Sequence, residues 1–187
     1  MSDAIKIELI HSQTSITISL LLVALVGWQW GYLLPVGVIV SNAAINAALK
    51  TIIQDDRPKV AEPPRLGCGG QVSVSGNSHG THSFGMPSGH TQMTTATFAF
   101  VALWCEARRR RKMMPTQGAV ACTTAFATLG VAVGWQRYNS KCHSLPQIAV
   151  GACLGVVIGT VGYLVSSKIK PDIFPPLTAS KFSNKCP

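Results

Sequence analysis

Residues 142–167 read CHSLPQIAVGACLGVVIGTVGYLVSS and contain no Asp, Glu, Lys or Arg. A helix needs about 20 apolar residues to cross the hydrocarbon core of a bilayer, so this stretch predicts a membrane-spanning helix near 144–167. Within it, Gly151, Gly155 and Gly159 recur at every fourth position, a spacing that lets a neighbouring helix approach closely. The stretch therefore predicts a tightly packed helix of a membrane protein.

Three further tracts lack charged residues in the same way: 15–49, 66–105 and 113–136. They predict helices near 12–29, 32–51, 88–108 and 115–138. Residues 66–85 are rich in Gly, Ser, His and Asn and predict a long polar loop after the second helix. We therefore expect an all-α polytopic membrane bundle of about five transmembrane helices. It spans residues 1–167, and 168–187 form a polar C-terminal tail.

The composition supports a membrane protein. Of the 187 residues, 47% are hydrophobic and only 12% are charged, about half the charge of a soluble domain. The net charge is +9, but the basic residues fall in clumps between uncharged tracts, which argues against binding to nucleic acid. Residues 1–10 carry one Lys and two acids, unlike the basic start of a signal peptide, so we expect the first helix to be retained.

The distribution of basic residues also predicts an orientation. The run at 108–112 reads RRRRK and shares one side of the bundle with the lysines of the tail, so the positive-inside rule makes that side cytoplasmic. The N-terminus, the loop 51–87 and the segment 138–143 then lie on the other side. For this non-cytoplasmic side we expect the lumen of the endoplasmic reticulum, with a virion or organelle membrane as alternatives.

Three segments on that side carry residues suited to phosphate chemistry. In the first, Lys50 and Arg57 are seven residues apart, close to two helical turns, so both can lie on one helix face. Two cations within reach of each other suit a phosphate. The alternative is a pair of anchors at the membrane interface.

The second segment, 85–92, opens a helix with Ser88 as a candidate N-cap. The backbone amides at Gly89 and His90 then provide an anion site, and the imidazole is available to protonate a leaving oxygen. The third segment brings Arg137 and His143 to the ends of successive helices. Each segment alone fits a plain cap or anchor, but ionisable groups gathered at one membrane face indicate a functional site.

The motifs Lys-x6-Arg-Pro (50–58), Pro-Ser-Gly-His (87–90) and Arg-x5-His (137–143) resemble, in kind and order, those of the type 2 phosphatidic-acid phosphatase superfamily. These integral-membrane lipid phosphatases are related to vanadium haloperoxidases. The resemblance covers roughly residues 30–165. The third family motif is usually Ser-Arg-x5-His-x3-Asp, whereas Gln136 replaces the serine here and Gln147 the aspartate. The dolichyl-diphosphatase branch has a Gln at the latter place, and the stretches 53–58, 85–92 and 143–147 look like those of that branch.

The resemblance implies a mechanism. His143 attacks phosphorus and forms a phosphohistidine, with Gln147 holding its ring, and His90 protonates the leaving oxygen and then activates water. The phosphate oxygens are bound by Lys50, Arg57, Ser88, Gly89 and Arg137. No metal or other cofactor is implied. The expected partners are a polyprenyl or dolichyl diphosphate substrate and the surrounding membrane lipids.

Two alternatives remain open. One is a phosphatidic-acid-type lipid phosphate phosphatase. The other is a catalytically inactive family member that serves as a structural subunit in a membrane complex, an interpretation favoured by Gln136 and Gln147.

Two other groups of residues are weaker candidates. Cys68 and Cys142 fall on the non-cytoplasmic side and can pair if that compartment is oxidising. His79 and His82 would suit a metal ion only with an acid or cysteine at ligand spacing, so a polar loop is the favoured interpretation.

Overall fold

The computed structural model describes residues 33–58 and 84–177. All regular secondary structure in these ranges is helical: α2 (Leu33–Ile53), α3 (Gly89–Arg110), α4 (Thr116–Asn139) and α5 (Leu145–Ile169). Each helix begins and ends within two residues of the predicted one, and α5 extends two residues into the predicted tail. The predicted helix at 12–29 lies outside the described residues.

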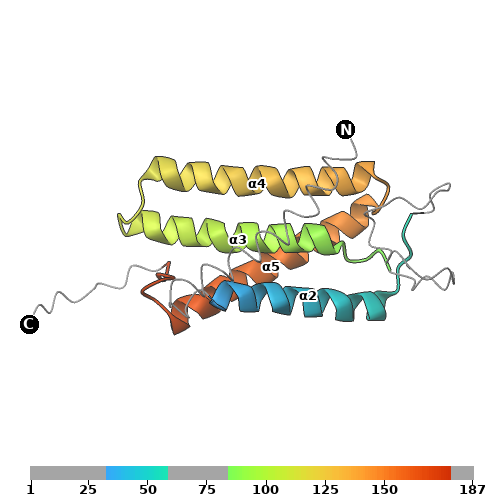
Figure 1. Ribbon diagram of the computed structural model, residues 1–187, viewed down its shortest axis with the longest axis horizontal. Helices are drawn as coiled ribbons and strands as arrows, with labels where there is room; N and C mark the ends of the chain where they lie inside the picture. Colours follow the sequence, from blue (N-terminus) through green and yellow to red (C-terminus); the bar gives the residue numbers. More distant parts are fainter. Residues whose placement is uncertain (1–32, 59–83, 178–187) are drawn as a thin grey trace, which may run out of the picture.

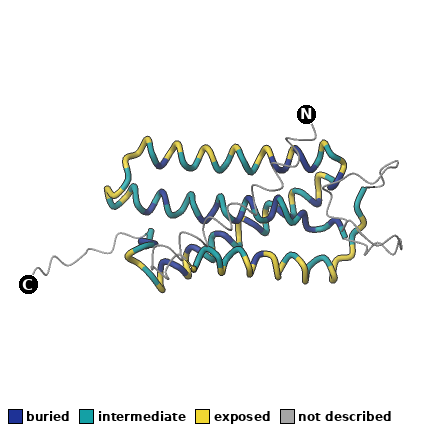
Figure 2. Tube along the Cα trace, in the orientation of Figure 1, coloured by how far each residue is buried: buried dark blue, intermediate teal, exposed yellow. Residues whose placement is uncertain are grey.

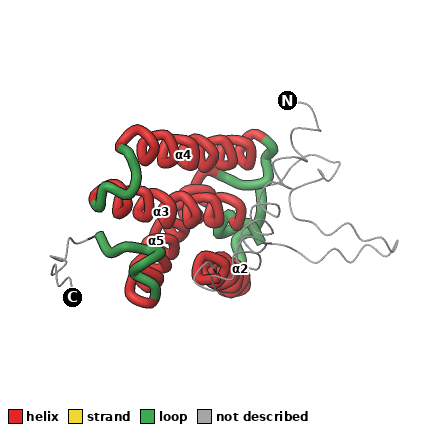
Figure 3. Tube along the Cα trace, turned by 60° about the vertical axis from the view of Figure 1, so that its left-hand side comes forward, coloured by secondary structure: helices red, strands yellow, loops and turns green. Residues whose placement is uncertain are grey.

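The central helix of the bundle is α3, which packs against α2, α4 and α5. α2 and α4 lie on either side of the α3 and α5 pair (Figure 1), and the turned view in Figure 3 also separates α2 from α4. Exposed positions follow the outer sides of α2 and α4, while buried positions gather where α3 and α5 meet (Figure 2). The core of the described structure is therefore the contact surface of α3.

Three of the four described helices are long and apolar enough to cross a membrane, namely α2, α4 and α5. α3 is more polar because it carries Gln92, several threonines and a basic last turn. Its polar groups are accommodated inside the bundle: Gln92 is fully buried, and the hydroxyl of Thr95 donates to the backbone oxygen of Thr91 at 2.8 Å. The central position of α3 thus explains its composition.

The glycines of α5 produce the close approach to α3 that their spacing predicts. A Cβ atom at Gly151 would lie 2.7 Å from the backbone oxygen of Ser88. Cβ atoms at Gly155 and Gly159 would overlap the backbone of α3 one and two turns further along. The two helices therefore pack backbone against backbone, as predicted.

The chain after α5 turns back onto the bundle. Trp104 Nε1 donates to the backbone oxygen of Ile173 at 3.0 Å, and the Tyr163 hydroxyl donates to that of Pro175. Between these two contacts, Phe174 is buried against α3. The first residues of the predicted tail therefore belong to the packed structure.

Candidate active site

The three predicted segments meet at one end of the bundle, on the right in Figure 1. The loop after α2 contacts the turn before α3 through a hydrogen bond from Gly85 N to Asp55 O of 2.7 Å. It also contacts the connection between α4 and α5, where Arg57 Nη1 donates to the backbone oxygen of Cys142 at 3.4 Å. Segments far apart in the sequence thus form one polar site.

His143 lies at the centre of this site and is only 3% exposed. Arg137, in the last turn of α4, is buried beside it, with Nη1 4.0 Å from the Cys142 sulfur. The positive charges of Arg57, Lys50 and Arg137 all act on the imidazole. The three predicted cations are therefore gathered around the predicted nucleophile.

The environment keeps this imidazole neutral. Burial lowers the pKa of His143 to about 4, helped by the surrounding charges of Arg57, Lys50 and Arg137, while the Gln147 side chain acts in the opposite direction. At neutral pH the ring is therefore uncharged, which is the form that has a lone pair for attack on phosphorus. Burial also lowers the pKa of Arg57, although a guanidinium remains charged in proteins.

His90 lies in the first turn of α3 and is half-buried. Arg137, His143, Lys50 and Arg57 all interact with it electrostatically. The two imidazoles therefore share one group of cations, and a phosphate bound by these cations would lie near both rings.

Ser88 is the N-cap residue of α3, as predicted, although its hydroxyl does not accept a bond from a helix amide. Ser88 Oγ instead pairs with Thr91 Oγ1 at 3.1 Å. The following residue, Gly89, lies against α2, where a Cβ atom would be 3.0 Å from Asn46 Oδ1. The start of α3 is thus buried against neighbouring segments.

The predicted arrangement of Lys50 and Arg57 on one helix face is wrong. α2 ends at Ile53, and Gln54 has a φ of 51°, the left-handed conformation that ends helices. Arg57 is carried by the loop that follows, and this loop folds towards the connection between α4 and α5. The two cations still act on the same imidazole, but Lys50 does so from the helix and Arg57 from the loop.

The two glutamines that replace the family residues are both buried. Gln136 donates through Nε2 to Ser140 Oγ at 3.5 Å. Gln147 lies beside His143, but its amide donates to Asp55 and to the backbone of Asp56. Nδ1 of His143 is buried and has no hydrogen-bond partner among the described residues. Gln147 also forms a side-chain hydrogen bond with His143, so its implied role in holding the ring stays a prediction.

Sequence reasoning missed two structural features near the site. Ser144 and Gln147 form a capping box at the start of α5, for which the Ser-x-x-Gln spacing is a known signal. Asn42 and Asn46, one turn apart on α2, contact the buried Gln92 of α3. Amides at this spacing in an apolar helix indicate a polar contact inside the bundle.

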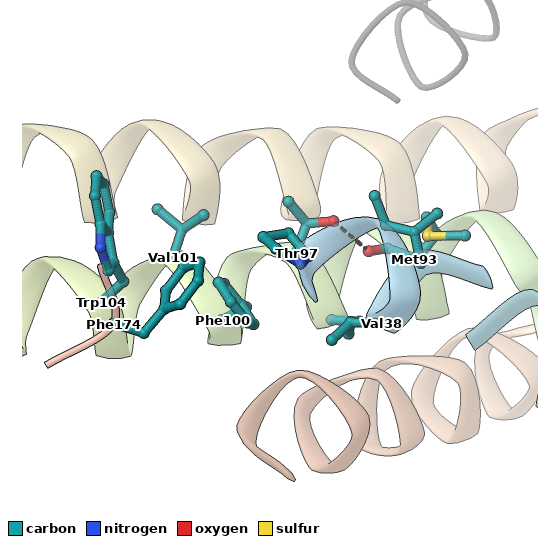
Figure 4. Close-up of a pocket in the computed structure, with 10 residues that line it drawn as sticks. Val38, Met93, Thr97, Phe100, Val101, Trp104 and Phe174 are labelled. Atoms are coloured by element: carbon teal, nitrogen blue, oxygen red, sulfur yellow. Dashed lines mark hydrogen bonds between the residues drawn. The ribbon is translucent and has the colours of Figure 1, made fainter. Parts of the chain in front are cut away.

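An apolar cavity of about 160 Å³ lies between α2, α3 and the chain after α5 (Figure 4). It begins near Met93, one turn after His90, and extends along α3 to Phe100 and Phe174. Thr97 presents no free hydroxyl donor to the cavity, because its Oγ1 donates to the backbone oxygen of Met93 at 3.0 Å. The polar site is thus adjacent to an apolar compartment.

The cysteines and possible metal ligands add one finding. Cys142, next to His143, is disulfide-bonded, whereas Cys105, Cys122 and Cys153 carry free thiols. Cys68, its predicted partner, lies outside the described residues, and so do His79 and His82. Residues 33–58 and 84–177 contain no group of three His, Cys, Asp or Glu side chains able to hold a metal ion.

Together, the apolar helices and the polar end of the bundle define a helical membrane protein with a cationic, histidine-containing site. The chain belongs to the PAP2 superfamily, whose family model matches residues 30–171. It is 22% identical over 147 residues to dolichyldiphosphatase 1 of Mus musculus, covering 76% of this chain and 56% of the relative. Dolichyldiphosphatase 1 of Rhinolophus ferrumequinum matches to the same extent.

The chain thus spans little more than half the length of these curated relatives. No solved structure matches it significantly.

Proposed function

We propose that the protein is a membrane lipid diphosphatase that removes a phosphate from a polyprenyl or dolichyl diphosphate through a phosphohistidine at His143. The observation that carries this proposal is the convergence of Lys50, Arg57 and Arg137 on a neutral, buried imidazole. Cations held in a water-poor site stabilise the negative charge of the phosphoryl transition state. The site faces the non-cytoplasmic side of the membrane, in the lumen of the endoplasmic reticulum.

The reaction has two steps. In the first, a lone pair of His143 forms a bond to phosphorus while the phosphorus–oxygen bond to the lipid phosphate breaks, and His90 gives a proton to the leaving oxygen. In the second, His90 takes a proton from water, which attacks the phosphohistidine and releases inorganic phosphate. Lys50, Arg57, Ser88, the Gly89 amide and Arg137 bind the phosphoryl oxygens throughout.

The apolar cavity supports a lipid substrate. It begins one turn from His90 and follows α3 for about three turns, which is roughly 16 Å of helix. The cavity would accommodate part of an apolar chain attached to a phosphate held at the site. The cavity lining is generic, so it supports an apolar chain without selecting between isoprenoid and acyl chains.

The test is phosphate release by the protein purified in detergent, with an isoprenoid diphosphate as substrate and a chelator present. Phosphatidic acid serves as competing substrate and distinguishes the phosphatidic-acid-type alternative. We expect turnover without added metal and an acid-labile phosphohistidine at His143 when labelled substrate is quenched. Strict dependence on a divalent ion, or turnover without a trapped intermediate, would overturn the covalent mechanism.

An inactive structural role is the competing function. It is favoured by Gln136 and Gln147, which replace the usual serine and aspartate of the third motif. In that case His143→Ala leaves every measured property unchanged except stability. The proposed enzyme instead loses all turnover in His143→Ala, while Arg110→Ala, an exposed cation at the far end of α3, retains it.

A further inference from the structure

Gln147 joins three segments of the site. Its Nε2 donates to Oδ2 of Asp55 at 2.7 Å and to the backbone oxygen of Asp56 at 2.8 Å. Its backbone oxygen accepts from Ser88 N at 3.1 Å. Both hydrogen bonds that Nε2 donates are thus directed at the loop after α2, while Oε1 accepts from Ser144 N at 3.1 Å, and the residue is only 2% exposed. The buried Gln147 side chain therefore anchors that loop through hydrogen bonds.

The turn before α3 is shaped to admit this contact. Gly85 N donates to the backbone oxygen of Asp55 at 2.7 Å, so Asp55 is held through both its backbone and its carboxylate. A Cβ atom at Gly85 would lie 2.7 Å from Cδ of Gln147. Any side chain at this position would displace the amide from Asp55.

Holding Asp55 also holds Arg57. The helix has already ended at Ile53, and Arg57 is only two residues beyond Asp55, about 7 Å along an extended chain. From there its Nη1 reaches the backbone oxygen of Cys142, the neighbour of His143. The location of the guanidinium thus depends on where Asp55 is held.

We propose that Asp55 and Gln147 are positioning residues, whose contact docks the loop after α2 so that Arg57 lies against His143. This inference rests on the proposed function. It also accounts for Gln147 where the family motif usually has an acid. A carboxylate at this position would face the carboxylate of Asp55 and would lack the hydrogen that now joins them.

The experiment is a double-mutant cycle that measures the affinity of the full-length protein for vanadate, a phosphate analogue. Gln147→Glu keeps the length of the side chain but places two carboxylates side by side, and juxtaposed like charges repel each other. We expect vanadate affinity to fall by at least about tenfold. Adding Asp55→Asn places an amide hydrogen-bond donor at position 55 opposite the carboxylate introduced at position 147. We then expect most of the lost vanadate affinity to return.

Asp56→Asn is the matched control. It removes the same charge one residue further on, but Asp56 is exposed and contacts Gln147 only through its backbone oxygen. In the Gln147→Glu background it should restore nothing. Equal recovery with Asp55→Asn and Asp56→Asn, no recovery with either, or unchanged affinity in Gln147→Glu would overturn the positioning role.

A milder pair of variants covers the case in which Gln147→Glu does not fold. Asp55→Ala should weaken vanadate binding by about tenfold, whereas Asp56→Ala should change it by less than about twofold. Equal affinities in this pair would overturn the proposal. Vanadate binding requires no turnover, so the positioning role can be tested even in a protein that does not hydrolyse lipid diphosphates. Vanadate binding without hydrolysis in the wild-type protein would overturn the proposed function alone.

Discussion

Asn46 on α2 donates through Nδ2 to Oε1 of Gln92 on α3, 2.8 Å away. Gln92 Nε2 in turn donates to Oδ1 of Asn42 at 3.0 Å. Lys50 lies one turn beyond Asn46, and His90 lies two residues before Gln92. This chain of amides therefore fixes the register of α2 against α3 directly below two residues of the candidate site.

Gln92→Leu should destabilise the protein, because it removes the hydrogen bonds that Asn42 and Asn46 make with this side chain inside the bundle. The expected loss is about 1–2 kcal/mol, the usual worth of a polar contact between membrane helices. Gln117→Leu, at an exposed position in the first turn of α4, is the matched control. Thermal unfolding in detergent measures both, and equal midpoints would show that the amides contribute no stability.

The His143 ring should not titrate between pH 8 and about pH 5, because its pKa is lowered to about 4. NMR of histidine-labelled protein, with the signal assigned from His143→Gln, measures this directly. Because an unfolded histidine has a pKa of about 6.5, the unfolded chain binds this proton more readily than the folded protein does. The contribution of His143 to stability is therefore lost as pH falls from about 6.5 towards 4. A midpoint between pH 6 and 7 in the folded protein would contradict this environment.

Gly159→Ala should destabilise the contact between α3 and α5, because the added Cβ overlaps the backbone of Ala96. Overpacking of this kind costs about 1–3 kcal/mol. Gly130→Ala on α4 is the same change in open space, with no atom within 4 Å of the added carbon, and should be neutral or stabilising by up to about 1 kcal/mol. Unfolding midpoints that shift in the same direction for both variants would argue against close packing at Gly159.

The basic run at 108–112 predicts which side of the membrane each end of the bundle faces. A glycosylation acceptor introduced at 75–80 should be modified, and one introduced near 110 should not. The opposite pattern would put the candidate site in the cytosol and exclude a lumenal function.

The helices were predictable because their signals are local. Uncharged tracts bounded by charged residues predicted the four described helices to within two residues, and the four-residue glycine spacing predicted the backbone contact of α5. The three motif segments were likewise expected on one side, because successive antiparallel helices bring their ends together. These inferences required only periodicity, length and order.

The details of the site depend on contacts that no local pattern encodes. α2 ends at Ile53, and the loop that follows is hydrogen-bonded to Gly85 and Gln147. These two residues lie 32 and 94 residues after Ile53. Counting residues from Lys50 to Arg57 therefore gave the right pair with the wrong geometry. The hydrogen bond from Gln147 to Asp55 was also missed, since a motif gives the order of residues and not their partners.

Because α3 runs antiparallel to α2 and α4, a membrane topology assigned from hydropathy alone would be wrong for this chain. α2 and α4 both end at the site, so α3 must run back across the same thickness between them (Figure 1). A count restricted to the three apolar helices would skip this return and invert the assigned direction of α4 and α5. Within residues 33–58 and 84–177, the side of the membrane assigned to His143 thus depends on whether the most polar helix is counted as a crossing.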